Sequence, residues 1–142
     1  LQNLLAGKSI VKQRIEGFSL IELMIVVAII ALLAMIAYPS YMETVRETRR
    51  TEGVALMNKV MQAQERHFIN NLTYTTDLTD LGFAVAANLP SENGHYQISA
   101  AACAGVPTDE CINIVATAQG GQAVEGNLGL SSRGEKTGNW ED

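Results

Sequence analysis

The sequence predicts an α+β protein in which one long N-terminal helix packs on a small antiparallel β-sheet. Two observations lead to this expectation. Residues 18–70 keep a helical character that only Pro39 interrupts. After His95 the pattern changes to short runs of alternating, β-branched residues, which are typical of strands. With 142 residues, the chain suits one domain with an appended segment.

An apolar run opens the helical region. The twenty residues from Phe18 to Ala37 contain two polar side chains, Ser19 and Glu22. Twenty helical residues span about 30 Å, the thickness of the hydrocarbon core of a bilayer. Three bases and one acid precede the run. This positive flank would stay in the cytoplasm, so the rest of the chain would face outward.

Three interpretations of this run compete. A secretory signal peptide would have a shorter apolar core and an A-x-A-like cleavage site after it, which is not found here. A plain membrane anchor does not account for Glu22, because a carboxylate in a spanning helix costs roughly 2–3 kcal/mol. The third interpretation is cleavage after Gly17. The new amine of Phe18 would then be neutralised by Glu22 of a neighbouring helix, which would set the stagger between helices.

The helix is expected to continue beyond the apolar run. Pro39 should kink the helix rather than end it, because helical signals resume at once. A second apolar stripe recurs at helical spacing and should pack on the sheet, and Asn70-Asn71 should end the helix. The stripe consists of Leu56, Val60, Ala63 and His67, widened by Met57, Met61 and Phe68.

The remainder predicts a loop and then a sheet. Residues 71–94 should form a loop, with Thr76 or Asp77 capping a short helical turn. Segments 95–100, 111–118, 127–132 and 137–140 should form a three- or four-stranded antiparallel meander, with turns near Gly120 and at 133–136. The apolar loop residues expected to tuck under the domain are Tyr74, Leu78, Leu81 and Phe83.

Cys103 and Cys111 lie eight positions apart. In an exported protein such a pair usually forms a disulfide, whereas cytosolic cysteines are more often free or metal-binding. A bridge here would pin the hairpin between two predicted strands. It would contribute roughly 2–3 kcal/mol on the loop-entropy account.

Composition and motifs argue against several functions. The net charge is −5 and aromatic residues are few, so no nucleic-acid partner is expected. His67 and His95 lack a ligand cluster, no catalytic triad is apparent, and no metal or other cofactor is expected. The helix carries a basic cluster that we interpret as a solvated face balanced by Glu43, Glu47 and Glu52, or else as a contact with another subunit or with DNA. Its members are Arg46, Arg49 and Arg50.

The N-terminal motif resembles a known family. Gly17-Phe18-Ser19-Leu20-Ile21-Glu22, followed by an unbroken apolar stretch and Pro39, resembles the type IV prepilin signature. The resemblance implies the type IV pilin fold and a membrane peptidase that cuts after Gly17 and methylates Phe18. It also implies that Glu22 guides assembly and that Pro39 bends the helix. Segments 64–83, 91–96 and 130–140 resemble the PilE-type minor pilins.

The resemblance implies a life cycle rather than a catalytic activity. Residues 1–17 would be a cleaved leader, 18–38 a transmembrane and filament-core helix, and 39–142 the exported domain. The protein would reside in the inner membrane before it joins an extracellular pilus that serves adhesion or twitching motility. Its partners would be membrane lipid, the prepilin peptidase, the inner-membrane assembly machinery and other pilins. The alternatives are a type II secretion pseudopilin, a membrane-anchored exported binding domain, and an adhesive or DNA-capturing tip subunit.

Overall fold

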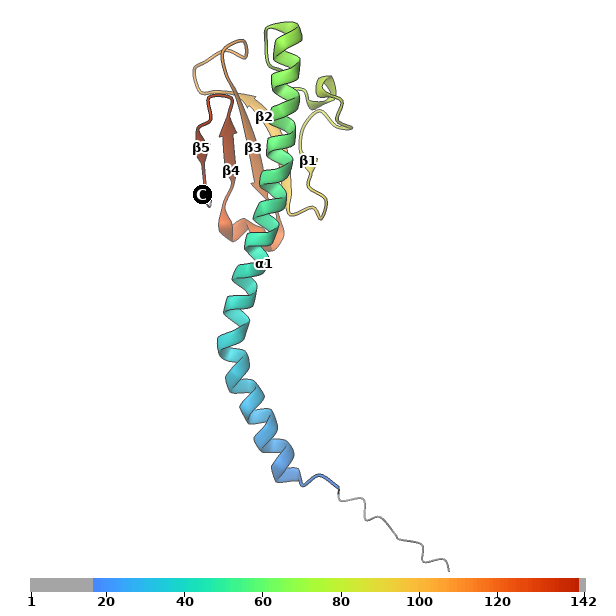
Figure 1. Cartoon of the computed structure of the whole chain (residues 1–142), viewed down its shortest axis with the longest axis vertical. Helices are drawn as coiled ribbons and strands as arrows, with labels where there is room; N and C mark the ends of the chain where they lie inside the picture. The colour runs from blue at the N-terminus through green and yellow to red at the C-terminus, as the bar shows by residue number, and fades with distance from the viewer. Residues whose placement is uncertain (1–16, 141–142) are drawn as a thin grey trace, which may run out of the picture. The chain divides into compact units, whose positions relative to one another are not determined.

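One helix, α1, runs from Leu20 to Asn71 in the computed structural model, which describes residues 17–140 (Figure 1). The expectation of a single helix that continues past Pro39 and ends at the two asparagines is confirmed. Contacts divide the chain into two units at the Pro39–Ser40 bond, and each unit is described by itself. The kink at Pro39 therefore stays a prediction.

The first unit contains only the apolar half of α1 in the described part of the chain. All of its side chains from Phe18 to Pro39 are exposed. By length and composition α1 could cross a membrane, and it is the one such helix among residues 17–140. The burial energy of this segment must therefore come from surroundings other than the described residues 17–140.

In the second unit, the remainder of α1 covers one face of an antiparallel sheet (Figure 1). The strand order is β1-β2-β3-β4-β5, so each strand pairs with its sequence neighbours. The bounds are β1 Leu89–Pro90, β2 Tyr96–Ala102, β3 Ile112–Ala118, β4 Leu128–Ser131 and β5 Lys136–Thr137. The sheet thus has five strands instead of the three or four expected.

Two differences in the sheet have local causes. Strand β1 pairs at two positions only, Leu89 with Ile98 and Pro90 with Gln97, which is too short to give an alternating pattern. Strand β5 begins at Lys136, earlier than expected, because Gly129 and Leu130 of β4 pair with Thr137 and Lys136. The predicted turn near Gly120 is a 3-10 helix, η2, at Gly120–Glu125.

The core lies between α1 and the inner face of the sheet. Met57 and Val60 of the helix meet inward-facing residues of three strands, among them Tyr96, Ile98, Ile114 and Leu128. The predicted stripe is confirmed at Met57, Val60 and Ala63, which are buried, whereas Leu56 and His67 are only half-buried. Gly53 and Gln64 are also buried and were not predicted. Gly53 is buried because the ring of Tyr96 lies directly on it.

The loop after the helix folds back on the core, as expected. A 3-10 helix, η1, spans Leu78–Leu81, and Asp77 caps it by accepting a hydrogen bond from the Thr79 N–H at 2.9 Å. Gln64 fixes the loop to α1, because its side chain donates to the Thr75 carbonyl (2.6 Å) and accepts from the Thr75 N–H (3.1 Å). Leu78 is buried, and Tyr74, Leu81 and Phe83 pack against the core.

Candidate functional site

The predicted processing and assembly residues lie at the N-terminal end of α1. Phe18 is exposed, and α1 begins two residues later with a hydrogen bond from the Leu23 N–H to the Ser19 carbonyl at 3.1 Å. Glu22 therefore lies in the first turn, where the helix dipole favours a carboxylate. Within residues 17–140 no ion pair or hydrogen bond to the Glu22 side chain is found. A cleaved amine on Phe18 would lie about one turn away along the chain.

Within the basic cluster of α1, Arg50 does not lie on the solvated face that we expected, whereas Arg46 and Arg49 are partly exposed. Arg50 is buried and forms an ion pair with Glu125 of η2, while Asn139 donates to the same carboxylate at 3.3 Å. The acid that pairs with Arg50 is therefore Glu125, from a distant segment, and not one of the three acids of α1 expected to balance the cluster. Glu52 does not balance the cluster either, since it accepts from the backbone and side chain of Asn93 at 2.8 and 3.0 Å.

A second polar contact joins α1 to η2. The Gln122 side chain is fully buried, and its amide donates to the Arg46 carbonyl and to the Tyr96 hydroxyl, each at 3.1 Å. Burial raises the pKa of Tyr96, although the hydrogen bond from Gln122 opposes that shift. Sequence analysis missed Gln122 and Glu125, because they were assigned to a plain turn. Buried polar groups require partners, and here the partners come from distant segments.

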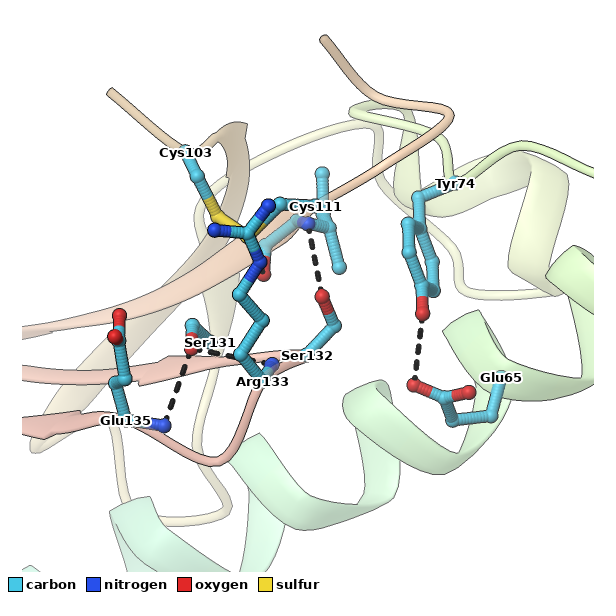
Figure 2. Close-up of a disulfide and its surroundings, with 9 residues drawn as sticks. Glu65, Tyr74, Cys103, Cys111, Ser131, Ser132, Arg133 and Glu135 are labelled. Atoms are coloured by element: carbon cyan, nitrogen blue, oxygen red, sulfur yellow. Dashed lines mark hydrogen bonds between the residues drawn. A yellow bond between two sulfur atoms is a disulfide. The ribbon is translucent and has the colours of Figure 1, made fainter. Parts of the chain in front are cut away.

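The disulfide between Cys103 and Cys111 is confirmed, with a Cα–Cα distance of 5.6 Å (Figure 2). It closes a loop whose Thr108 carbonyl accepts a hydrogen bond from the Tyr74 N–H at 3.0 Å. Tyr74 also donates through its hydroxyl to Glu65 at 3.2 Å (Figure 2). The disulfide loop therefore supports the segment that follows α1.

The two histidines lie apart from any metal-binding group. His67 is near Asn71 on α1, with 3.3 Å between Nδ1 and the Asn71 amide, and His95 precedes β2. Among the described residues no group of three or more histidine, cysteine, aspartate or glutamate side chains is placed to hold a metal ion. The expectation that the protein binds no metal stays a prediction.

Comparison with protein families identifies both parts of the chain. The model described as "Prokaryotic N-terminal methylation motif" matches residues 12–38. The model described as "Type IV minor pilin ComP, DNA uptake sequence receptor" matches residues 39–127, more than half of the chain. The chain belongs to this type IV minor pilin family. The comparison with curated proteins gives no match.

Membership confirms the recognition of a type IV pilin and its α+β fold. The chain is a type IV minor pilin subunit, of a family of structural pilins, and this decides against the pseudopilin alternative. The methylation motif and the apolar helix fit anchoring in the inner membrane before assembly into an extracellular pilus. The expectation of no nucleic-acid partner is not supported, because the family is described as a receptor for DNA uptake sequences.

Proposed function

We propose that this minor pilin is made as a precursor, cut after Gly17, methylated on Phe18 and inserted into the pilus through Glu22. The observation that carries the proposal is the methylation-motif match over residues 12–38, which spans the cleavage position and the whole apolar run. Residues 1–16 lie outside the described part of the chain. The exposed apolar half of α1 supports the same conclusion, because no other described residue buries its side chains.

Glu22 has a defined task in this proposal. An ionised carboxylate among lipid tails or packed helices costs several kcal/mol unless a cation neutralises it. Among the described residues, no such cation lies near Glu22 in the first turn of α1. The methylated amine of Phe18 on a neighbouring subunit supplies one. A helix shifted along its neighbour would leave both charges unpaired, so Glu22 sets the register of the filament core.

The exported domain then acts as a structural module rather than as an enzyme. The partners proposed for it are membrane lipid, the prepilin peptidase, the inner-membrane assembly machinery and finally other pilins. Because apolar helices exchange lipid for one another, leaving the membrane does not forfeit their burial. Its contribution to the pilus would be in assembly and in adhesion or twitching motility.

Processing can be tested by replacing Gly17 in the full-length chain. Gly17→Leu is expected to block cleavage, so the precursor accumulates in membranes and the subunit is absent from sheared filaments. Gly7→Leu is the matched control in the leader and should be processed normally. The proposal is wrong if the Gly17→Leu chain is still cut between residues 17 and 18, or if uncut chains reach the filament.

A second candidate function is binding of DNA, which the description of the family favours. Charge restricts how this could work. Residues 1–17 carry three bases and one acid, so residues 18–142 carry a net charge of −7, from 7 bases and 14 acids. Binding would have to be local, through exposed bases such as Lys59, Arg66 and Arg133. Arg133 follows β4, and its side chain points toward the disulfide (Figure 2).

DNA binding can be measured by fluorescence anisotropy on the detergent-solubilised mature chain. Duplexes enriched from the genome of the host cell should bind more tightly than shuffled duplexes of equal composition. The logarithm of the binding constant should fall linearly with the logarithm of salt concentration, and Arg133→Ala should lower that slope by about 1. Glu135→Ala, two residues after Arg133 in the same turn, should not weaken DNA binding. Equal affinity for enriched and shuffled duplexes would exclude a sequence receptor.

A further inference from the structure

The turn between β1 and β2 contains a chemically labile pair, Asn93-Gly94. It is the one asparagine followed by glycine among the 142 residues. In such a pair the backbone nitrogen of the glycine can attack the side-chain carbonyl of the asparagine, because glycine has no side chain to shield that nitrogen and its backbone adapts easily. Both residues are exposed, so water reaches them. The pair therefore has the chemistry and the accessibility that deamidation requires.

Glu52 of α1 holds Asn93 at two points. Its carboxylate accepts hydrogen bonds from the backbone N–H of Asn93 at 2.8 Å and from the side-chain amide at 3.0 Å. Hydrogen bonds to an ionised acceptor are stronger than those between neutral groups. The Gly94 N–H is engaged as well, since it donates to the Ser91 carbonyl at 2.9 Å. While the turn is closed, the leaving amide and the attacking nitrogen are each bound to another group.

Few contacts attach this turn to the domain. Strand β1 pairs with β2 at two positions and lies at the edge of the sheet. Ser91 closes the hairpin, because its N–H donates to the Tyr96 carbonyl at 2.9 Å and its hydroxyl accepts from the Tyr96 N–H at 3.2 Å. Among the described hydrogen bonds, those of Glu52 are the ones that join residues 92–95 to α1. The position of the turn against the helix thus depends on the amide of Asn93.

We propose that Asn93 is a site of deamidation, which Glu52 slows and whose product detaches the turn from α1. In the reaction the Gly94 nitrogen bonds to Cγ of Asn93, the bond from Cγ to Nδ2 breaks, and that nitrogen leaves as ammonia with the proton from Gly94. Water then opens the cyclic imide at one of its two carbonyl carbons. The product carries a carboxylate at position 93, as aspartate or as isoaspartate, and no electron is gained or lost.

The product would place a second carboxylate against Glu52. The amide donor that lies 3.0 Å from the Glu52 oxygen is replaced by an acceptor with the same charge as Glu52. Like charges at this separation repel each other. An open groove of about 590 Å³ already lies between α1 and the turn, lined in part by Glu52, Glu92 and Asn93. The repulsion should move the turn away from the helix and widen this groove. The inference concerns the exported domain alone and does not rest on the proposed processing.

Deamidation can be followed in the detergent-solubilised full chain by peptide mass spectrometry that separates aspartate from isoaspartate. Asn139 is an internal control, because it is exposed and donates to a carboxylate, that of Glu125 at 3.3 Å, but is followed by tryptophan. Deamidation should be faster at Asn93 than at Asn139. The product should include isoaspartate, because direct hydrolysis of the amide gives aspartate alone. Equal rates at the two positions, or aspartate as the sole product, would overturn the proposal.

Glu52→Ala tests the protection by the carboxylate. Deamidation at Asn93 should become about threefold faster or more, because loss of hydrogen bonds to a charged group populates the open turn. Glu47→Ala, an exposed acid on the same helix, should leave the rate unchanged. A rate in Glu52→Ala equal to that of the wild type, or lower, would overturn the protective role. If Glu52→Ala does not fold, the wild type unfolded in urea replaces it, and it too must react faster than the folded chain.

Asn93→Asp tests the consequence, because it supplies the aspartate product directly. Amide hydrogen exchange in residues 92–95 should become about threefold faster or more, while exchange in β3 stays unchanged. In the Glu52→Ala background the same substitution should have no further effect, because the repelling partner is absent. Exchange at the wild-type rate in Asn93→Asp would show that the turn stays attached, and would overturn the proposed detachment.

Discussion

The two halves of α1 belong to one continuous helix but have different surroundings. From Phe18 to Tyr41 every side chain is exposed in the structure. From there to Asn71 the helix buries a stripe against the sheet, at Arg50, Gly53, Met57, Val60, Ala63 and Gln64. The second half has its partner in its own chain. The first half must find its partner elsewhere, in lipid before assembly and in other helices afterwards.

This difference separates assembly from stability. In the proposed function, assembly depends on Glu22 in the exposed half, which contributes nothing to the folded domain. Residues of α1 that stabilise the domain, such as Arg50 and Gly53, lie in the second half, where they are buried. A substitution should therefore change either the incorporation of the subunit into filaments or the stability of its domain, and leave the other unchanged.

Glu22→Ala should have the largest effect. Without the carboxylate, the Phe18 amine of a neighbouring subunit loses its partner in a nearly apolar environment, which is worth several kcal/mol. Incorporation into filaments should fall at least tenfold, while the thermal midpoint of the domain stays unchanged. Glu43→Ala, an acid beyond the apolar run of the same helix, is the control. Normal incorporation of Glu22→Ala would show that the acid has no role in assembly.

Arg50→Ala should give the largest loss of stability. It leaves Glu125 mostly buried without its cation, and breaking such a pair costs about 3 kcal/mol or more. Urea unfolding of the detergent-solubilised chain, followed by the fluorescence of its single tryptophan, measures the loss. Glu47→Ala, one turn earlier and exposed, should change the unfolding free energy by less than about 0.5 kcal/mol. The double variant Arg50→Met with Glu125→Gln should recover much of the stability, and failure to do so would mean that packing rather than charge is lost.

Gly53→Ala should destabilise the domain even though alanine favours helices. An added Cβ would lie 2.7 Å from Cδ2 and 2.9 Å from Cγ of the Tyr96 ring, which is fully buried and hydrogen-bonded. Overpacking of this kind costs about 1–3 kcal/mol, against a helix-propensity gain of about 1 kcal/mol. Gly121→Ala is a matched control, because nothing lies within 4 Å of its added Cβ. Equal stability of the two variants would contradict the close approach of helix and sheet.

The smallest effect should come from acid titration of Glu52. Partial burial opposes its ionisation, but the hydrogen bonds from Asn93 outweigh that effect and lower its pKa from the ordinary value of 4.5. Because the folded pKa lies below the unfolded one, the stabilisation is complete above about pH 4.5 and is lost as the pH falls through the lower folded value. Glu52→Gln should therefore be less stable than the wild type near neutral pH, with the difference shrinking in acid. A difference independent of pH would assign the effect to packing.

Local patterns in the sequence were sufficient for most of the fold. The length of α1 and its end followed from helical periodicity and from the asparagine pair. Strands β2 and β3 followed from runs with β-branched residues, and β4 from its position after the turn near Gly120. Strand β1 was missed, because two residues, one of them Pro90, carry no periodic signal. The buried stripe was predicted at Met57, Val60 and Ala63 but not at Gly53, because Gly53 is covered by the ring of Tyr96, forty-three positions away.

The candidate site was also predicted only where its residues lie close together in the sequence. The N-terminal motif and the disulfide were predicted because their residues lie close together in the sequence. The pairing of Arg50 with Glu125 was not, because the two residues are 75 positions apart and each has charged or polar neighbours nearer in sequence. The left-handed backbone conformation of Leu72, whose φ is +58°, was not predicted either. Leucine rarely adopts the left-handed conformation, so an asparagine pair followed by leucine does not predict an apolar side chain at a position that favours glycine.

The central claim is that this minor pilin is processed at Gly17–Phe18 and inserted into the filament. Intact-mass spectrometry of sheared filaments and of cell membranes from the same culture tests it most directly. The account predicts that filaments contain a chain beginning at Phe18 with the added mass of an N-terminal methyl group, present in smaller amount than the major subunit. A chain in filaments that retains Gly17, or a processed chain confined to membranes, would contradict the account.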